Sequence, residues 1–156
     1  MIFSTQSDPP VHLLAGFARF LPDKSPELVL QAPGRALWAA VIRRPDEYFS
    51  MASLEFDTRA VFSYQSAKVR RTLMRRPLPS WVRYGAGMLV LLSNHGLDVS
   101  GFDAVVAGNE SDEVRYEYSV GLAFAAIHHT LSGTTYTEDK LVDLAERVRR
   151  EYVQAP

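Results

Sequence analysis

The stretch LVLQAPGRALWAAVI, residues 28–42, places two short apolar runs on either side of a Pro-Gly pair. Runs of this length are typical of buried strands, and Pro33-Gly34 indicates a turn between them. Residues 48–56 and 58–65 are rich in aromatic and β-branched side chains, which favour strands. We therefore expect residues 28–65 to form an antiparallel meander of three or four strands.

Apolar residues with helical spacing lie on both sides of this strand region. Residues 11–21 have this spacing and follow a start signal, Asp8-Pro9-Pro10. After the strands, the pattern predicts a helix, a strand and two more helices, at residues 81–94, 102–107, 112–131 and from 135 on. We find no internal repeat and no linker, and we therefore expect a single α+β domain over residues 1–156.

Several residues are candidates for ending these helices. Ser80 is the expected N-cap of the first helix after the strands, and Gly133 is expected just past the end of the long helix over 112–131. Thr135 and Glu138 have the spacing of a capping box, which predicts the start of the last helix.

Composition excludes several classes of function. The chain has 156 residues, 17 Lys and Arg, 18 Asp and Glu, and no cysteine. Disulfides, a thiol nucleophile and a cysteine zinc site are therefore excluded, and the near-zero net charge gives no general attraction to nucleic acid or membrane. No signal peptide and no apolar run of roughly 20 residues is visible, so we expect a soluble, cytoplasmic protein without a membrane partner.

Four stretches resemble one family in the same order. They are APGR at 32–35, WVRYG at 81–85, GFDAVVAG at 101–108 and KLVDLAER at 140–147. Together they resemble the N-terminal domain of galactokinase-like sugar kinases of the GHMP group. The resemblance implies an α+β fold, a mostly antiparallel sheet with helices packed on one face. It also implies a family reaction in which ATP phosphorylates a sugar hydroxyl.

The resemblance assigns candidate residues for the sugar site. Arg35 holds the position of the family arginine near the reacting hydroxyl, which makes it the catalytic candidate. Asp46 and Tyr48 could replace the end of the family's G-E-H-x-D-Y segment and bind the sugar, although its glycine, glutamate and histidine are absent. The alternative for Arg35 is a buried structural arginine paired with an acid such as Asp103.

The nucleotide motif of the family is largely missing. A loop of the form G-x-G-L-S-S-S-A-A-L lets backbone amides at a helix N-terminus bind phosphate. Here residues 112–122 have no glycine ahead of Ser119, which matches the last serine and is the candidate nucleotide-binding residue. Asp112, Glu113 and Glu117 would repel a triphosphate, so we expect no ordinary ATP binding. The sequence assigns no cofactor.

Two other groups of residues have simpler interpretations. His128 and His129 point about 100° apart on a helix, so they should not share a metal ion, and we expect a helix-end or surface role. The basic run at 68–76 could contact phosphates, but no nucleic-acid motif accompanies it. We expect a solvated surface there rather than a nucleic-acid interface.

These features predict a galactokinase-like domain with at most residual sugar or nucleotide binding. In the family, the catalytic aspartate and a second, C-terminal kinase domain lie downstream of the last motif, so we expect a domain that is not a self-sufficient kinase. Two alternatives stay open: a regulatory or protein-interaction module, and one half of an active kinase completed by another chain. An uncovered half-domain face would favour a homodimer or a partner chain.

Overall fold

The structure is a computed structural model that describes residues 2–4, 10–97, 100–110 and 112–155. Six strands form one sheet in the order β1-β2-β3-β6-β4-β5. The strands are β1 (Ile2–Ser4), β2 (Leu28–Gln31), β3 (Leu37–Arg43), β4 (Phe49–Ser53), β5 (Thr58–Phe62) and β6 (Phe102–Gly108). The helices are α1 (Val11–Phe20), α2 (Tyr64–Lys68), α3 (Arg83–Asn94), α4 (Glu113–Ser132) and α5 (Glu138–Val148), with short helical turns η1 (Ser80–Val82) and η2 (Arg149–Val153).

The sheet is mixed and mostly antiparallel, as the family resemblance implied. The β1–β2 and β4–β6 pairs are parallel, and the other three pairs are antiparallel. The expected meander is wrong in one respect, because β6 lies between β3 and β4. Most residues of β3 and β6 are buried on both faces of the sheet, which suits the centre of a covered sheet. Sequence order therefore does not give strand order here.

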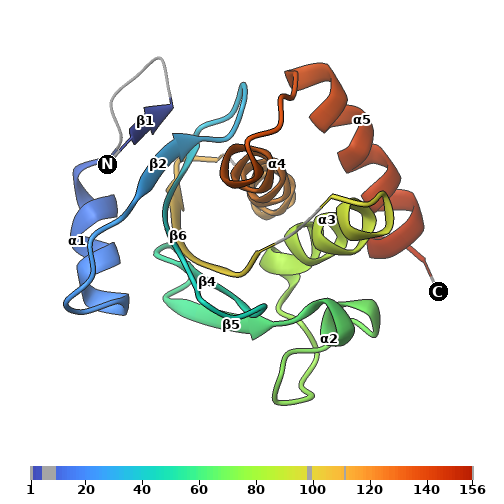
Figure 1. Cartoon of the computed structure of the whole chain (residues 1–156), viewed down its shortest axis with the longest axis horizontal. Coiled ribbons are helices and arrows are strands. Elements are labelled where there is room, and N and C mark those ends of the chain that lie inside the picture. Colours follow the sequence, from blue (N-terminus) through green and yellow to red (C-terminus); the bar gives the residue numbers. More distant parts are fainter. Residues whose placement is uncertain (1, 5–9, 98–99, 111, 156) are drawn as a thin grey trace.

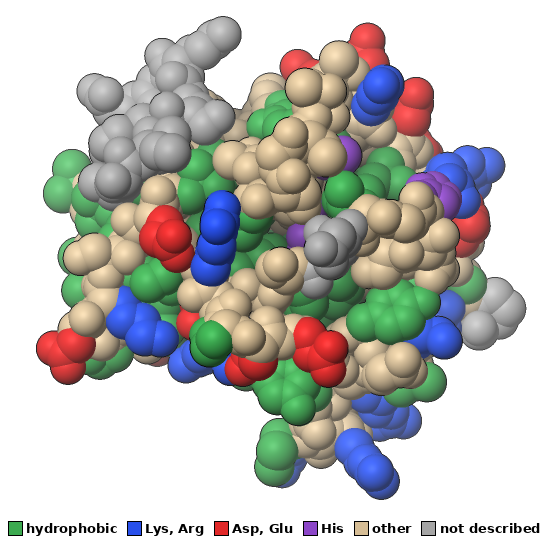
Figure 2. Space-filling model, viewed as in Figure 1, with side chains coloured by type: hydrophobic (Ala, Val, Ile, Leu, Met, Phe, Trp, Pro, Cys, Tyr) green, Lys and Arg blue, Asp and Glu red, His purple; other side chains and the backbone are tan. Residues whose placement is uncertain are grey.

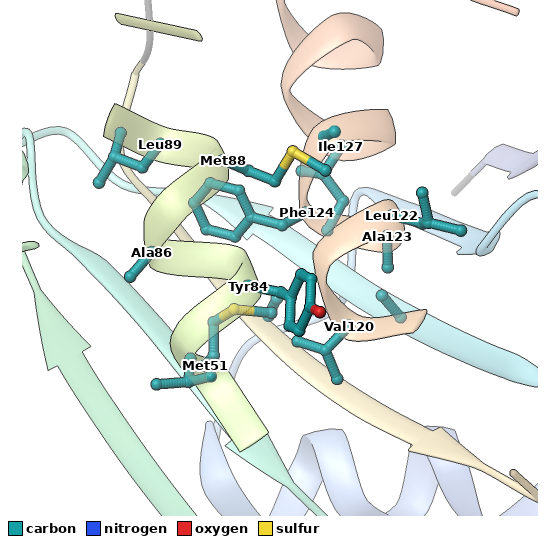
Figure 3. Packing of buried hydrophobic residues seen from close by; sticks show 14 of the residues in the cluster. Met51, Tyr84, Ala86, Met88, Leu89, Val120, Leu122, Ala123, Phe124 and Ile127 are labelled. Atoms are coloured by element: carbon teal, nitrogen blue, oxygen red, sulfur yellow. The ribbon is translucent and has the colours of Figure 1, made fainter. Parts of the chain in front are cut away.

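Helices cover the two faces of the sheet unequally (Figure 1). The larger core lies between the sheet and the layer of α3, α4 and α5, where Phe124 of α4 packs close to Met88 of α3 (Figure 3). On the other face, Leu13 and Phe17 of α1 pack on Trp38 and Val105. The helices are therefore not confined to one face, because α1 covers a second, smaller core.

One of the three expected helix ends is found: Gly133 ends α4 with φ 72°. The start of α4 is capped by Asp112, whose side chain accepts from the backbone N–H of Arg115. The expected capping box at Thr135 is wrong, because Thr137 caps α5 and accepts from the Lys140 N–H at 3.2 Å. Ser80 opens η1 rather than capping a helix.

Two other sequence expectations concern segment ends. The strand expected over 58–65 stops at Phe62, because Ser63 forms a capping box with Ser66 and starts α2. The start signal of α1 falls partly on Asp8 and Pro9, which lie outside the described residues, and Pro10 offers no side-chain cap. Within the described residues, no helix has the length and apolar character needed to cross a membrane.

Candidate functional site

A tight turn between β2 and β3 places Arg35 two residues before the start of β3. The Arg35 N–H donates to the Ala32 carbonyl at 3.0 Å, with Pro33 and then Gly34 between them. Gly34 has φ 71°, the left-handed conformation that the third position of a type II turn requires. The positive φ is therefore what favours glycine here, since the only group that a β-carbon would meet is the movable carboxylate of Glu138.

The Arg35 guanidinium is bound on three sides by the chain itself. Its Nε donates to Ser119 Oγ at 2.8 Å, and its Nη2 lies 3.1 Å from Glu110 Oε2. Its Cζ lies 5.4 Å from the centre of the Tyr118 ring. The structure therefore brings together Arg35 and Ser119, the candidates for the reacting centre and the nucleotide, and it joins them directly.

Glu110 connects this arginine to the backbone of the turn. Its Oε1 accepts from the Ala36 N–H at 2.7 Å while its Oε2 pairs with Arg35, and only 6% of its side chain is exposed. Because Ser119 is fully buried and already accepts from Arg35, a ligand that reached Ser119 would have to displace that hydrogen bond.

Carboxylates of the chain also occupy other donors near the start of α4. Asp112 Oδ1 accepts from the Arg115 N–H at 2.8 Å. Glu55 Oε1 accepts from the Gly108 N–H at 3.1 Å and from the Tyr116 hydroxyl at 3.0 Å. Free amides at a helix N-terminus attract anions, and here the Asp112 carboxylate occupies one of those of α4. A phosphate approaching this end of α4 would meet Glu55, Glu110 and Asp112.

Burial shifts the pKa of Glu117 and Tyr118, the two side chains that precede Ser119. Burial raises the pKa of Glu117, although Arg83 Nη2 lies 3.4 Å from its Oε2 and opposes that shift. Burial also raises the pKa of the Tyr118 hydroxyl. This environment favours the uncharged forms of both side chains.

Asp46 and Tyr48 do not share a site with Arg35. They follow the last residue of β3, whereas Arg35 precedes the first, so seven strand residues separate them. Asp46 accepts from Arg44 Nε at 2.9 Å and from the Tyr48 N–H at 3.1 Å, and the Arg44 guanidinium holds the pKa of Asp46 below its usual range. Tyr48 borders a separate cleft of about 400 Å³ beside α2 and α3.

Asp103 has different partners from the one that the sequence suggested. Its Oδ1 accepts from Arg44 Nη1 at 2.9 Å and lies 3.5 Å from Arg59 Nη2, and its side chain is 2% exposed. The pairing of Arg35 with Asp103 is therefore wrong, although Arg35 does pair with an acid, Glu110. The register explains this: Leu37 pairs with Gly108 at one end of β3, and Asp103 pairs with Ile42 near the other end.

The two neighbouring histidines have different environments. His128 is 1% exposed and lies in the core, so a surface role for it is wrong. His129 lies near the end of α4, where its Nδ1 is 2.7 Å from Thr134 Oγ1, and this agrees with a helix-end role. Among the described residues, no group of three or more His, Cys, Asp or Glu side chains could hold a metal ion.

Solved structures with the same fold include a galactokinase and two mevalonate kinases. The galactokinase of Lactococcus lactis, solved with galactose, superposes with a TM-score of 0.70 at 16% identity, over 92% of this chain and 42% of the galactokinase chain. The mevalonate kinase of Methanococcus jannaschii matches with a TM-score of 0.57 at 9% identity, over 76% of this chain and 37% of that chain. In sequence comparisons, no family model and no curated protein matches the chain.

These similarities establish the fold. The chain has the α+β fold of GHMP kinases, and the galactokinase-like resemblance of its sequence agrees with it. It spans about two fifths of the length of the kinase chains that it matches.

Sequence reasoning missed Glu110 and Glu55, the acids that bind the donors of this site. The partnership of Glu110 with Arg35 depends on the antiparallel pairing of β3 with β6, which sets residue 110 beside residue 36. The available signal was an acid, Glu110, two residues after the glycine that ends β6. It indicates a partner for Arg35 only once the pairing of β6 with β3 is known.

Proposed function

We propose that this domain is a galactokinase-like fold without self-sufficient kinase activity, which binds sugar or nucleotide at most weakly. One observation carries the proposal: Glu110 binds both the Arg35 guanidinium and the Ala36 N–H. The arginine and the backbone amide that could meet an anion are thus already satisfied by a carboxylate. A triphosphate would have to break both contacts and lie beside the negative charges of Glu110 and Asp112.

The proposal is tested by thermal unfolding with magnesium and ATP, ADP, galactose and a panel of other sugars. A ligand at ten times its dissociation constant adds about 1.4 kcal/mol to the free energy of unfolding, which raises the Tm of a chain of this size by roughly 3 °C. We expect no rise at millimolar nucleotide. The galactokinase of Lactococcus lactis, melted in the same panel, serves as the positive control. A reproducible rise with magnesium and ATP would overturn the proposal.

The variant Glu110→Gln tests whether the negative charge of Glu110 is what prevents nucleotide binding. The amide keeps the shape but loses the negative charge, so the ion pair with Arg35 is lost and Tm should fall. If nucleotide then raises the Tm of the variant and not that of the native chain, the acid is what prevents binding. Glu138→Gln, at a nearby exposed acid, is the matched control.

A further inference from the structure

The exposed large apolar side chains of the described residues gather at two places. They are Val11, Leu14, Tyr48, Phe56, Val69, Leu73, Met74 and Val114. Val11, Leu14, Phe56 and Val114 lie among carboxylates, and the other four lie beside or within a loop rich in arginine. Tyr48 also lies beside two acids, because its N–H donates to Asp46 and Glu47 lines the same cleft. Exposed apolar patches rimmed by polar or charged side chains are typical of interaction surfaces.

The first surface, here called the basic end, is the loop between α2 and η1 together with Tyr48. Residues 58–97 include seven Lys and Arg and no Asp or Glu. Met74 is 80% exposed and Val69 is 66% exposed. Basic and apolar side chains gather where this loop projects at the lower end of the molecule (Figure 2). Tyr48 and Leu73 border the same cleft.

The loop of the basic end has a defined shape. The Thr72 N–H donates to the Arg76 carbonyl at 2.9 Å, and the Arg76 N–H donates to Thr72 Oγ1 at 3.2 Å. The Leu73 N–H donates to the Val61 carbonyl of β5 at 3.0 Å, which fixes the loop to the sheet. Its charges are therefore presented without the entropy cost of ordering a free loop.

The second surface, the acidic end, joins the start of α1, the β4–β5 turn and the start of α4. Its carboxylates are Glu55, Asp57, Asp112 and Glu113, and its exposed apolar residues are Val11, Leu14, Phe56 and Val114. The Phe56 and Tyr116 rings lie 5.2 Å apart, and Glu55 Oε2 lies 4.0 Å from His12 Nε2. Arg19 and Arg115 pair with two of the four carboxylates, so the surface stays net negative.

The two surfaces cannot meet within one molecule. Tyr48 precedes the first residue of β4, whereas Phe56 follows the last, so they lie at opposite ends of the same strand. Each could be covered by the other surface of a second copy, with apolar side chains in contact and opposite charges paired. A nucleic acid fits the basic end less well, because phosphates would not cover the exposed apolar side chains of Met74, Val69 and Leu73.

We infer that copies of this chain associate head to tail, the basic end of one on the acidic end of the next. Arginine and methionine are enriched in protein interfaces, and charge complementarity determines which surfaces meet. Because the two surfaces differ, the contact is heterologous and leads to a ring or an open chain rather than a symmetric dimer.

The test is sedimentation velocity over a concentration series at low and high salt. The native chain should associate with rising concentration, and salt should weaken the association. Arg75→Glu and Glu113→Lys should each weaken self-association at least about tenfold, because like charges then meet. Lys24→Glu, an exposed residue of neither surface, makes the same charge change as Arg75→Glu and should have no effect.

A mixture of the two variants is the decisive experiment. The reversed basic end of Arg75→Glu complements the reversed acidic end of Glu113→Lys, and their unaltered surfaces also match. The mixture should therefore associate although neither variant does so alone, provided that melting curves show both to be folded. A native chain that stays monomeric at millimolar concentration would overturn the inference, as would a mixture without rescue. Monomers that bind polyglutamate or duplex DNA would assign the basic end to another partner.

Discussion

At the scale of the residue, His128 is a titratable side chain enclosed by aromatic rings. Its ring centre lies 5.5, 5.3 and 4.6 Å from those of Phe49, Phe102 and Phe124. Its Nε2 has no hydrogen-bond partner, and burial lowers the pKa of the imidazole to about 3. A charged imidazole cannot be solvated in this position, so folding requires the neutral form.

This histidine should make stability depend on pH. In the unfolded chain its pKa returns to 6.5, so between pH 6.5 and 3 the unfolded state binds more protons than the folded state. Above pH 6.5 the histidine is neutral in both states and does not lower the free energy of unfolding. As the pH falls from 7 to 5, protonation of the unfolded chain at this residue lowers that free energy by about 2 kcal/mol. Urea unfolding of the native chain and of His128→Phe at these pH values measures the contribution. An equal loss in both proteins would contradict it.

At the scale of the element, glycines determine how closely α3 and α4 approach. A β-carbon on Gly121 of α4 would lie 2.6 Å from Tyr84 Cβ of α3, a contact that neither backbone can relieve easily. A β-carbon on Gly85 of α3 would lie 3.4 Å from its nearest atoms, in Met51 and Phe124, which is ordinary packing. The two helices therefore depend on glycine at one of these positions and not at the other.

Alanine at these two positions should have opposite effects. Gly121→Ala should force the helices apart and lower the free energy of unfolding by about 1–3 kcal/mol. Gly85→Ala fits and removes the backbone entropy cost of glycine, so it should leave stability unchanged or raise it by up to about 1 kcal/mol. Chemical denaturation of both variants measures this. If Gly121→Ala were as stable as Gly85→Ala, the close approach would not limit packing.

Most helices and strands could be predicted from the sequence, but which strands lie side by side in the sheet could not. Apolar periodicity gave α1, α3 and α4 to within two residues at each end, because one face of each helix is buried. The position of β6 in the sheet could not be predicted, since pairing with β3 and β4 joins residues far apart in the chain. Thr135 and Thr137 both offer a hydroxyl, and only the backbone path selects Thr137 as the cap.

At the scale of the whole molecule, the same limit applies to the candidate site. Arg35 and Ser119 were each selected by motif position, and the fold brings them within 2.8 Å. Asp46 and Tyr48 were selected in the same way, but the length of β3 places them at the far end of the sheet. A motif gives the order of residues along the chain. Which of them meet depends on strand direction and register, and these follow from burial of the whole sheet.

The two cores of the molecule differ greatly in size, and this should make its stability uneven. The core under α3, α4 and α5 includes most of the buried apolar residues, whereas α1 is attached mainly through Leu13, Phe17 and Leu21. Segments with few buried contacts open locally at lower free energy than the global unfolding. We therefore expect backbone amides of α1 to exchange with deuterium faster than those of α4.

Truncating one phenylalanine in each core tests whether α1 opens independently. Phe17 and Phe124 are both fully buried. Loss of either ring lowers a free energy by about 3–5 kcal/mol. For Phe17 it is the free energy of opening α1, and for Phe124 it is the free energy of opening the larger core. Phe17→Ala should speed exchange in α1 at least about hundredfold while α4 exchanges through its own, unchanged local openings. Phe124→Ala should speed exchange in α4 and leave it unchanged in α1, because α1 opens locally without exposing that ring. Equal acceleration of α1 and α4 by Phe17→Ala would show instead that the two cores unfold as one cooperative unit, with α1 as stable as the helices of the larger core.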